Sequence, residues 1–153
     1  MNIVKNLDQY DLTCVYFCEP IKNNVMNEGI FIRILYSTAD FVLNGVTLLL
    51  PLCEVNVEKY YNKYKCVFSY ALHKDLIEQF RVVEEDLLKK YNIPNKIPLL
   101  KINEQLKNGN IKFFLEKDDK ISNGNFILKI SGIWETDTQY GLTYKFLKAQ
   151  YPT

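Results

Sequence analysis

The chain has 153 residues, of which 48% are hydrophobic and 24% are charged, and its formal net charge is +1. This length and composition are ordinary for a soluble globular protein with a core of its own, so we expect a single domain over residues 1–153. The near-zero charge excludes a strong overall field, so a nucleic-acid function would need a local basic patch.

No segment approaches the ~20 apolar residues of a membrane span, and the N-terminus lacks the apolar run of a signal peptide. The chain has a single histidine, His73, and no C-x2-C spacing among its cysteines, which are Cys14, Cys18, Cys53 and Cys66. We therefore expect an intracellular, reducing compartment, with no membrane partner, no metal and no cofactor.

The first third of the chain shows the apolar alternation of strands. A polar lead-in at 1–11 and a loop at 20–29 separate strands predicted at 12–18, 30–36 and 41–50, and Asn44-Gly45 indicates a bulge or tight turn in the third strand. Arg33 lies in the otherwise apolar second strand. It either sits at a sheet edge with its head in water or points from a sheet face at an anion.

The stretch KYYNKYK at 59–65 is the next candidate binding segment in the sequence. It contains Lys59, Tyr60, Tyr61, Lys63, Tyr64 and Lys65. Basic side chains bind along the phosphate backbone, and aromatic side chains stack on bases. Proteins that bind single strands with little sequence preference use this combination. The alternative is a solvated turn with its tyrosines packed inward. The stretch is predicted to be an exposed loop or strand edge.

The apolar spacing changes to that of a helix at 74–91, after a short β-like run at 67–72. The helix should end before Pro94, and its acidic residues are expected to face water: Glu78, Glu84, Glu85 and Asp86. Further predicted elements are a short helix at 98–106, a strand at 111–115 with Lys112 and Phe114 on one face, and a polar loop at 117–125.

The segment at 126–148 reads FILKISGIWETDTQYGLTYKFLK, and its alternation predicts that the rest of the chain is organised around it. Two alternating arms flank a polar turn at 135–139, which predicts an antiparallel hairpin. Gly132 indicates a bulge or a close backbone approach, and Gly141 lies where the second arm begins. The outer face of the hairpin should show Lys129, Ser131, Thr143 and Lys145.

This order of strands, one main helix and further strands predicts a mainly β protein with α (α+β). It lacks the repeated β-α-β unit of doubly wound nucleotide folds, and it has no Gly-rich phosphate loop. The simplest architecture is an OB-like antiparallel β-barrel with one main amphipathic helix between the strand groups.

The sequence offers no constellation for catalysis. It has no G-x-S-x-G motif, and a dyad would need His73, which is expected at the surface or in the cap of the main helix. Asp118 and Asp119 lie between Lys117 and Lys120, as in a solvated turn. We therefore expect a binding protein and not an enzyme.

The pattern ISGIWETDTQYGLTYKF resembles the last hairpin of OB-fold single-stranded DNA-binding proteins encoded by phages, large DNA viruses and related mobile elements. The strands GIFIRILYS and VFSY and the helix that ends in EEDLL agree with that layout. The resemblance implies a replication or recombination protein that coats single strands with little sequence preference. It implies a role in binding for Trp134, Tyr144 and Lys145 and a structural role for Gly132 and Gly141. Trp134 has a second interpretation, as a core residue beside Gly132.

Such proteins often end in an acidic tail that recruits replication partners. This chain carries no acidic run at its end, so recruitment through a tail is not expected. The competing hypothesis is a virus-type structural or protein-interaction module that kept the barrel and lost nucleic-acid binding.

Both lines of reasoning predict one interface, a groove across the sheet. Arg33, Lys112, Lys129 and Lys145 would neutralise phosphates there. Some of six aromatic residues are expected to stack on bases: Tyr36, Tyr60, Tyr61, Tyr64, Trp134 and Tyr144. The lysines of 59–65 add basic charge. The expected partner is single-stranded DNA, with RNA as the alternative. Replication proteins and a second copy of the chain are further expected partners, at a viral replication site in the host nucleus or cytoplasm.

Overall fold

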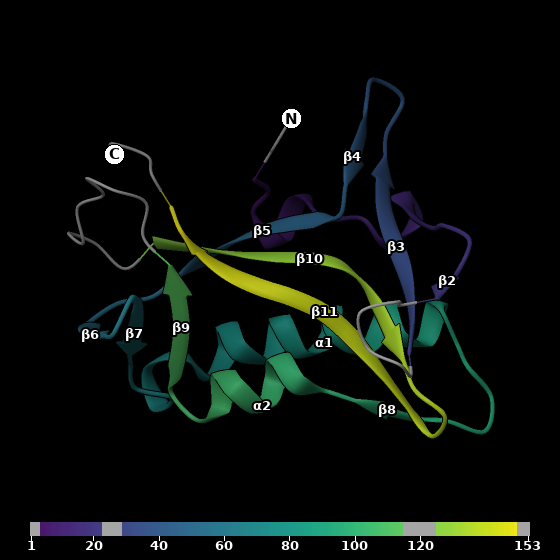
Figure 1. Cartoon of the computed structure of the whole chain (residues 1–153). Coiled ribbons are helices and arrows are strands. Elements are labelled where there is room, and N and C mark those ends of the chain that lie inside the picture. Colours follow the sequence, from purple (N-terminus) through teal and green to yellow (C-terminus); the bar gives the residue numbers. More distant parts are fainter. Residues whose placement is uncertain (1–3, 23–28, 115–124, 150–153) are drawn as a thin grey trace.

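In the computed structural model, the described residues are 4–22, 29–114 and 125–149. They form one large sheet with helices against one of its faces (Figure 1). The described helices are α1 (Lys74–Lys90) and α2 (Lys101–Lys107), with short 3-10 turns at Leu7–Gln9, Leu12–Cys14 and Ala71–His73. The strands are, in chain order, β1 (Val15–Phe17), β2 (Ile21–Lys22), β3 (Ile30–Ser37), β4 (Val42–Asn44), β5 (Val46–Pro51), β6 (Asn56–Tyr60), β7 (Lys63–Val67), β8 (Ile97–Leu99), β9 (Asn110–Phe114), β10 (Asn125–Glu135) and β11 (Gln139–Lys148).

The antiparallel hairpin of β10 and β11 lies at the centre of the sheet, as predicted for 126–148. The other edge of β10 pairs with β5 over its first half and with β3 over its second half. The far edge of β11 carries β8 and β9, both parallel to it, and β7 and β6 extend the sheet from β9. The mainly β, α+β class is confirmed. The described strands run from β1 to β6 without closing into a barrel.

A bulge at Gly132 lets β3 and β5 share one edge of β10. The register of the hairpin shifts between Ile130 and Gly132. A Cβ on Gly132 would lie 2.4 Å from the carbonyl oxygen of Ile32 and 2.5 Å from the ring of Phe31. These distances are shorter than any van der Waals contact, so the close approach requires glycine. The bulge predicted from this glycine is confirmed.

The strand predicted at 41–50 is two strands, separated at Gly45. β4 pairs with β3, whereas β5 pairs with β10. Gly45 has a φ of 85°, and its N–H donates to the carbonyl of Ile34. A left-handed residue at this point turns the chain from one partner strand to the other.

Other predicted elements are present with different bounds. The β-like run at 67–72 contributes only Val67, because the chain then enters a 3-10 turn. The polar loop at 117–125 lies outside the described residues except for Asn125, as do Asp118 and Asp119. Three elements are confirmed within the described residues: the helix at 74–91 as α1, the strand at 30–36 as β3 and the strand at 111–115 as β9.

Two elements begin later than predicted. The first turn of the helix predicted at 98–106 is not formed. Residues Ile97–Leu99 pair with β11 as β8, and α2 begins only at Lys101. The strand predicted at 12–18 is shortened to β1, because Leu12–Cys14 form a 3-10 turn.

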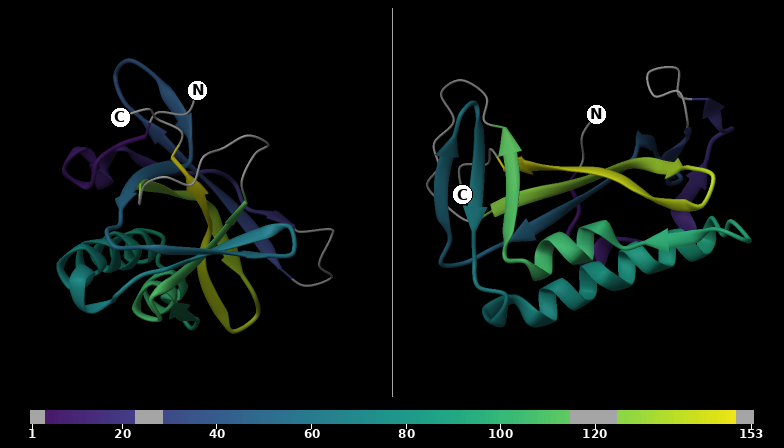
Figure 2. Two further views of the ribbon diagram at one scale, coloured as in Figure 1. Left: turned by 90° about the vertical axis from the view of Figure 1, so that its left-hand side faces the viewer. Right: turned by 60° about the horizontal axis from the view of Figure 1, so that its bottom comes forward.

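The core lies between the sheet and the helices, which run along one side of β10 and β11 (Figures 1 and 2). We call this side of the sheet the inner face and the opposite side the outer face. Alternate residues of the strands are buried on the inner face. The largest fully buried side chains come from strands and both helices, among them Ile32, Leu48, Phe80, Leu87, Ile102, Phe113 and Phe126.

Glu84 of α1 is not in water, so that part of the helix prediction is wrong. Its side chain is buried, with 1% of its surface exposed. Its carboxylate accepts hydrogen bonds from the backbone N–H groups of Ile102 (2.9 Å) and Asn103 (2.8 Å), in the first turn of α2. Glu84 therefore satisfies two N–H groups of α2 that no side chain at its N-cap satisfies. Burial raises the pKa of Glu84 to about 7, against the opposing effect of the two N–H groups.

Replacement of Gly132 by alanine should destabilise the fold strongly. The new methyl group meets the Ile32 carbonyl, so β3 must move away from β10, and we expect a loss of roughly 3 kcal/mol in the free energy of unfolding. Urea unfolding of Gly132→Ala and of the neighbouring Ser131→Ala compares the two sites. The serine variant loses one hydrogen bond to Thr143, worth about 1 kcal/mol. Equal losses at both positions would contradict the close approach.

Burial of Glu84 should make stability depend on pH between about 4.5 and about 7. The folded protein binds this proton more tightly than the unfolded chain does, so the free energy of unfolding should fall as pH rises through that window and level off above it. Between about pH 5 and pH 8 the wild type should lose about 2 to 3 kcal/mol more than Glu84→Gln. Urea unfolding at several pH values measures this difference.

The exposed Glu104 of α2 provides a control for Glu84, because Glu104→Gln should keep the pH dependence of the wild type. Parallel stability profiles for the wild type and Glu84→Gln would show that Glu84 does not titrate differently on folding.

Candidate nucleic-acid interface

Lysines on four adjacent strands share the outer face of the sheet. Lys129 of β10 pairs directly with Lys145 of β11, and Lys112 of β9 pairs directly with Lys65 of β7. β11 and β9 are joined in parallel one residue further along, where Phe146 pairs with Phe113. Residues opposite one another on neighbouring strands point to the same face. The four side chains therefore form a row across β10, β11, β9 and β7, which we call the lysine row: Lys65, Lys112, Lys129 and Lys145.

The lysine row is not a stabilising arrangement. Like charges directly opposite one another on paired strands lower stability. Within the described ranges, none of the four lysines forms an ion pair. Thr47 pairs with Lys129 at the β5 end, and Glu58 pairs with Lys65 at the β6 end, so the row stops at these residues. A concentration of unpaired positive charge on one face is suited to a polyanion.

Two aromatic rings lie against glycines on the same face. Trp134 of β10 pairs with Phe31 of β3 and with Gly141 of β11. A Cβ on Gly141 would lie 2.8 Å from Cζ2 of the Trp134 ring, and the Phe31 ring covers Gly132 in the same way. Both rings are half-buried. Trp134 is therefore neither a core residue nor fully exposed.

Arg33 lies between this aromatic pair and the lysine row. It pairs with Gly132 of β10, and its carbonyl accepts a hydrogen bond from the N–H of Cys18 at 2.9 Å, so β3 has neighbours on both sides there. The side chain is exposed on the outer face. Arg33 therefore lies on a face of the sheet and not at its edge, which agrees with the second of the two interpretations as far as its position is concerned.

The stretch at 59–65 spans the end of β6, the turn at 61–62 and the start of β7, and most of its described side chains are exposed, as predicted. Tyr61 has a φ of 58° and is 82% exposed at the turn. Lys59 and Tyr64 pair with each other on the face opposite to Lys65; the Lys59 side chain is exposed, whereas the Tyr64 ring stacks on Phe113 with centroids 5.7 Å apart. Lys63 and Lys65 point outward. The side chain of Tyr60 lies outside the described part of the chain.

Three of the tyrosines predicted to stack on bases, Tyr36, Tyr64 and Tyr144, are on the inner face, so they do not lie on the same face as the lysine row. Tyr36 is 2% exposed, and its hydroxyl accepts a hydrogen bond from the N–H of Asp11 at 3.0 Å. Tyr144 donates its hydroxyl to Oε1 of Gln105 on α2 at 2.8 Å, and burial raises its pKa to about 12. The rings of Tyr36 and Tyr144 are held by partners within the fold.

Sequence reasoning missed two aromatic residues of the outer face. Phe114 of β9 is 58% exposed, and Nζ of Lys63 lies 5.6 Å from the centre of its ring. The alternation of the strand, which places Phe114 on the same face as Lys112, was enough to predict this position of Phe114. The alternation of the strand at 30–36 likewise places Phe31 on the face of Arg33, but its position over Gly132 depends on the pairing of β3 with β10.

His73 occupies the N-cap of α1, which is one of the two positions expected for it, and it is buried there. Its Nδ1–H donates to the carbonyl of Ser69 at 2.7 Å, and its Nε2 accepts the N–H of Cys53 at 3.0 Å. Among the described residues, no group of three or more His, Cys, Asp or Glu side chains could hold a metal ion. In the same part of the chain, neither helix is long and apolar enough to cross a membrane.

Comparisons of the chain with protein families, with curated proteins and with solved structures gave no significant match. The function must therefore be argued from the geometry of this chain.

Proposed function

We propose that the outer face of the sheet binds single-stranded DNA without sequence preference. The observation that carries this proposal is the lysine row, whose four lysines lie on adjacent strands and form no ion pair with any described residue. Neighbouring strands are about 4.8 Å apart, so the row offers a positive charge at short, regular intervals. A nucleic-acid backbone that crosses the strands along the row could place several phosphates near ammonium groups.

Aromatic rings flank the lysine row on both sides. Trp134 and Phe31 lie beyond Arg33 on one side, and Phe114 lies next to the row on the other. Stacking of a base on such a ring contributes ~1–3 kcal/mol and is open to every base, because each has a π-face. Lysine contacts to phosphates carry no sequence information either. The combination favours binding without sequence preference.

The same arrangement favours single strands over duplexes. The rings lie against the sheet, so they can stack only on a base that is free to leave its own stack. In a duplex the base faces are covered by neighbouring pairs, whereas an unpaired strand can turn its bases toward Trp134 and Phe114.

We extend the proposal to a role in viral-type DNA replication or recombination on an OB-like fold. The support for this step is the resemblance of the hairpin at 126–148, whose two strands carry Lys129, Trp134 and Lys145 of the outer face. A protein-interaction module on the same sheet is the alternative outcome of the experiments below.

Loss of two charges from the lysine row should weaken binding and reduce its dependence on salt. For single strands, the slope of log K against log salt is about −0.7 per phosphate contacted, so four contacts give about −3. Lys129→Gln/Lys145→Gln should reduce the slope by about 1.4 and the affinity at least about tenfold. Fluorescence anisotropy of a labelled oligo-dT of about 30 nucleotides, between about 50 and 200 mM salt, measures both.

Lys101→Gln/Lys107→Gln is the matched control, because it removes the same charge from exposed lysines of α2, on the inner side of the sheet. This variant should bind nearly as the wild type does. Absence of binding at low salt, or equal losses in the two double variants, would rule out the lysine row as the interface and leave the protein-interaction module.

Trp134, the only tryptophan, should report binding directly. Its fluorescence should be quenched by single-stranded oligo-dT, less so by a duplex, and the quenching should weaken as salt rises. Trp134→Leu should lose about tenfold in affinity by anisotropy, the equivalent of one stacked base. Tyr144→Phe, which changes the inner face, should keep the affinity of the wild type. An unchanged affinity in Trp134→Leu would exclude stacking at this position.

A further inference from the structure

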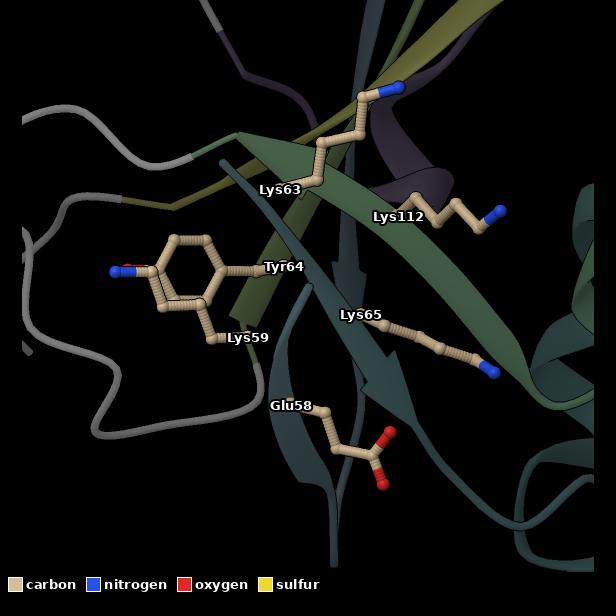
Figure 3. A pocket seen from close by; sticks show the side chains of 6 residues that line it. All are labelled: Glu58, Lys59, Lys63, Tyr64, Lys65 and Lys112. Carbon is tan, nitrogen blue, oxygen red and sulfur yellow. The ribbon is translucent and has the colours of Figure 1, made fainter. Parts of the chain in front are cut away.

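A hollow of about 400 Å³ lies where β6, β7 and β9 meet, at one end of the lysine row (Figure 3). This volume is within the range of small-ligand sites. The residues that line it are Glu58, Lys59, Lys63, Tyr64, Lys65 and Lys112. With four lysines and one glutamate, the lining has a formal charge of +3.

Most of these charged side chains point to the same side of the hairpin of β6 and β7. Lys65 and Lys112 are directly paired, and Figure 3 shows them reaching toward the same side of the hairpin. Lys63 lies two residues before Lys65 on that side, with its Nζ 5.6 Å from the centre of the Phe114 ring. Figure 3 shows Lys59 and Tyr64 reaching the opposite way. At the hollow, the outer face of the sheet therefore presents three ammonium groups and the carboxylate of Glu58.

The charge of the hollow suits a dense anion better than an ordinary phosphodiester. A phosphodiester carries one negative charge, whereas a phosphomonoester carries about 1.5 to 2 at neutral pH. Each ammonium group offers three donors, and charge-assisted hydrogen bonds to phosphate oxygens are among the strongest in proteins. Glu58 pairs with Lys65 at the last strand of the sheet, so it opposes a backbone that continues past the hollow. A strand on the lysine row should therefore end there.

We propose that this hollow binds a terminal phosphate group, either a phosphomonoester or a polyphosphate, through Lys63, Lys65 and Lys112. The inference rests on the proposed function, since Lys65 and Lys112 are also the last two members of the lysine row. The group could belong to the end of a bound strand or to a free nucleotide. Its occupant would also relieve the repulsion between the paired lysines.

Short oligonucleotides test the proposal, because the terminal phosphate is a large part of their charge. Oligo-dT of about six nucleotides with a 5′-phosphate, a 3′-phosphate or neither would be compared by competition against a labelled strand. We expect one of the phosphorylated forms to bind about tenfold more tightly than the unphosphorylated form. Inorganic tripolyphosphate, tested alone by thermal shift at constant ionic strength, should stabilise the protein.

Lys65→Gln/Lys112→Gln should abolish both effects, and Lys101→Gln/Lys107→Gln should keep both. The first variant removes a pair of like charges, so it should fold at least as stably as the wild type, and thermal unfolding checks this. A preference for a phosphorylated end supports a strand end as the source, and stabilisation by tripolyphosphate without that preference supports a free nucleotide.

Failure of this inference can be separated from failure of the proposed function. Tight binding of long oligo-dT with neither an effect of terminal phosphates nor stabilisation by tripolyphosphate would overturn the hollow as a phosphate site and leave the lysine row intact. Stabilisation by tripolyphosphate without any binding of oligo-dT would support the hollow and overturn strand binding.

Discussion

The backbone pairing of β10 with its neighbours is the constraint on which the rest of the structure depends. One edge of β10 is occupied by β11 and the other by β5 and β3 in succession, which is possible because the strand bulges at Gly132. β11 in turn holds β8 and β9. The hairpin thus fixes the relative positions of segments that are more than a hundred residues apart in the chain, including Arg33 and Thr143 on either side of Gly132.

The pleat of these strands separates stability from the proposed binding chemistry. Neighbouring residues of β11 show the division clearly, because Tyr144 is hydrogen-bonded to α2 while Lys145 is exposed on the outer face. The inner face is organised by burial against α1 and α2, and the two helices are joined through the buried carboxyl of Glu84. Replacement of an exposed lysine of the outer face should therefore leave the core undisturbed.

The outer face combines features that cost stability and have no role in the core. Lysines lie directly opposite lysines, and large aromatic rings remain half-exposed over glycines. Positive charge decreases at Glu58, beside the hollow at β6, β7 and β9. The proposed binding of a strand with unpaired bases rests on these features together, and Glu58 marks the proposed end of that strand.

The sequence by itself determined what depends on local periodicity: the class of the fold, helix α1, strands β3 and β9, the hairpin of β10 and β11, and the outward direction of Lys112, Lys129 and Lys145. Gly132 was also readable, because a glycine within a strand pattern indicates a bulge. The tertiary structure alone decided which strands are neighbours, since pairing is made by backbone hydrogen bonds between distant segments. It therefore decided that Lys65 joins the lysine row, that β4 and β5 take different partners and that β8 lies beside β11. It also decided the burial of Tyr36 and Glu84 and the contact of Tyr144 with α2, because most buried polar groups lie where the fold brings them a hydrogen-bond partner.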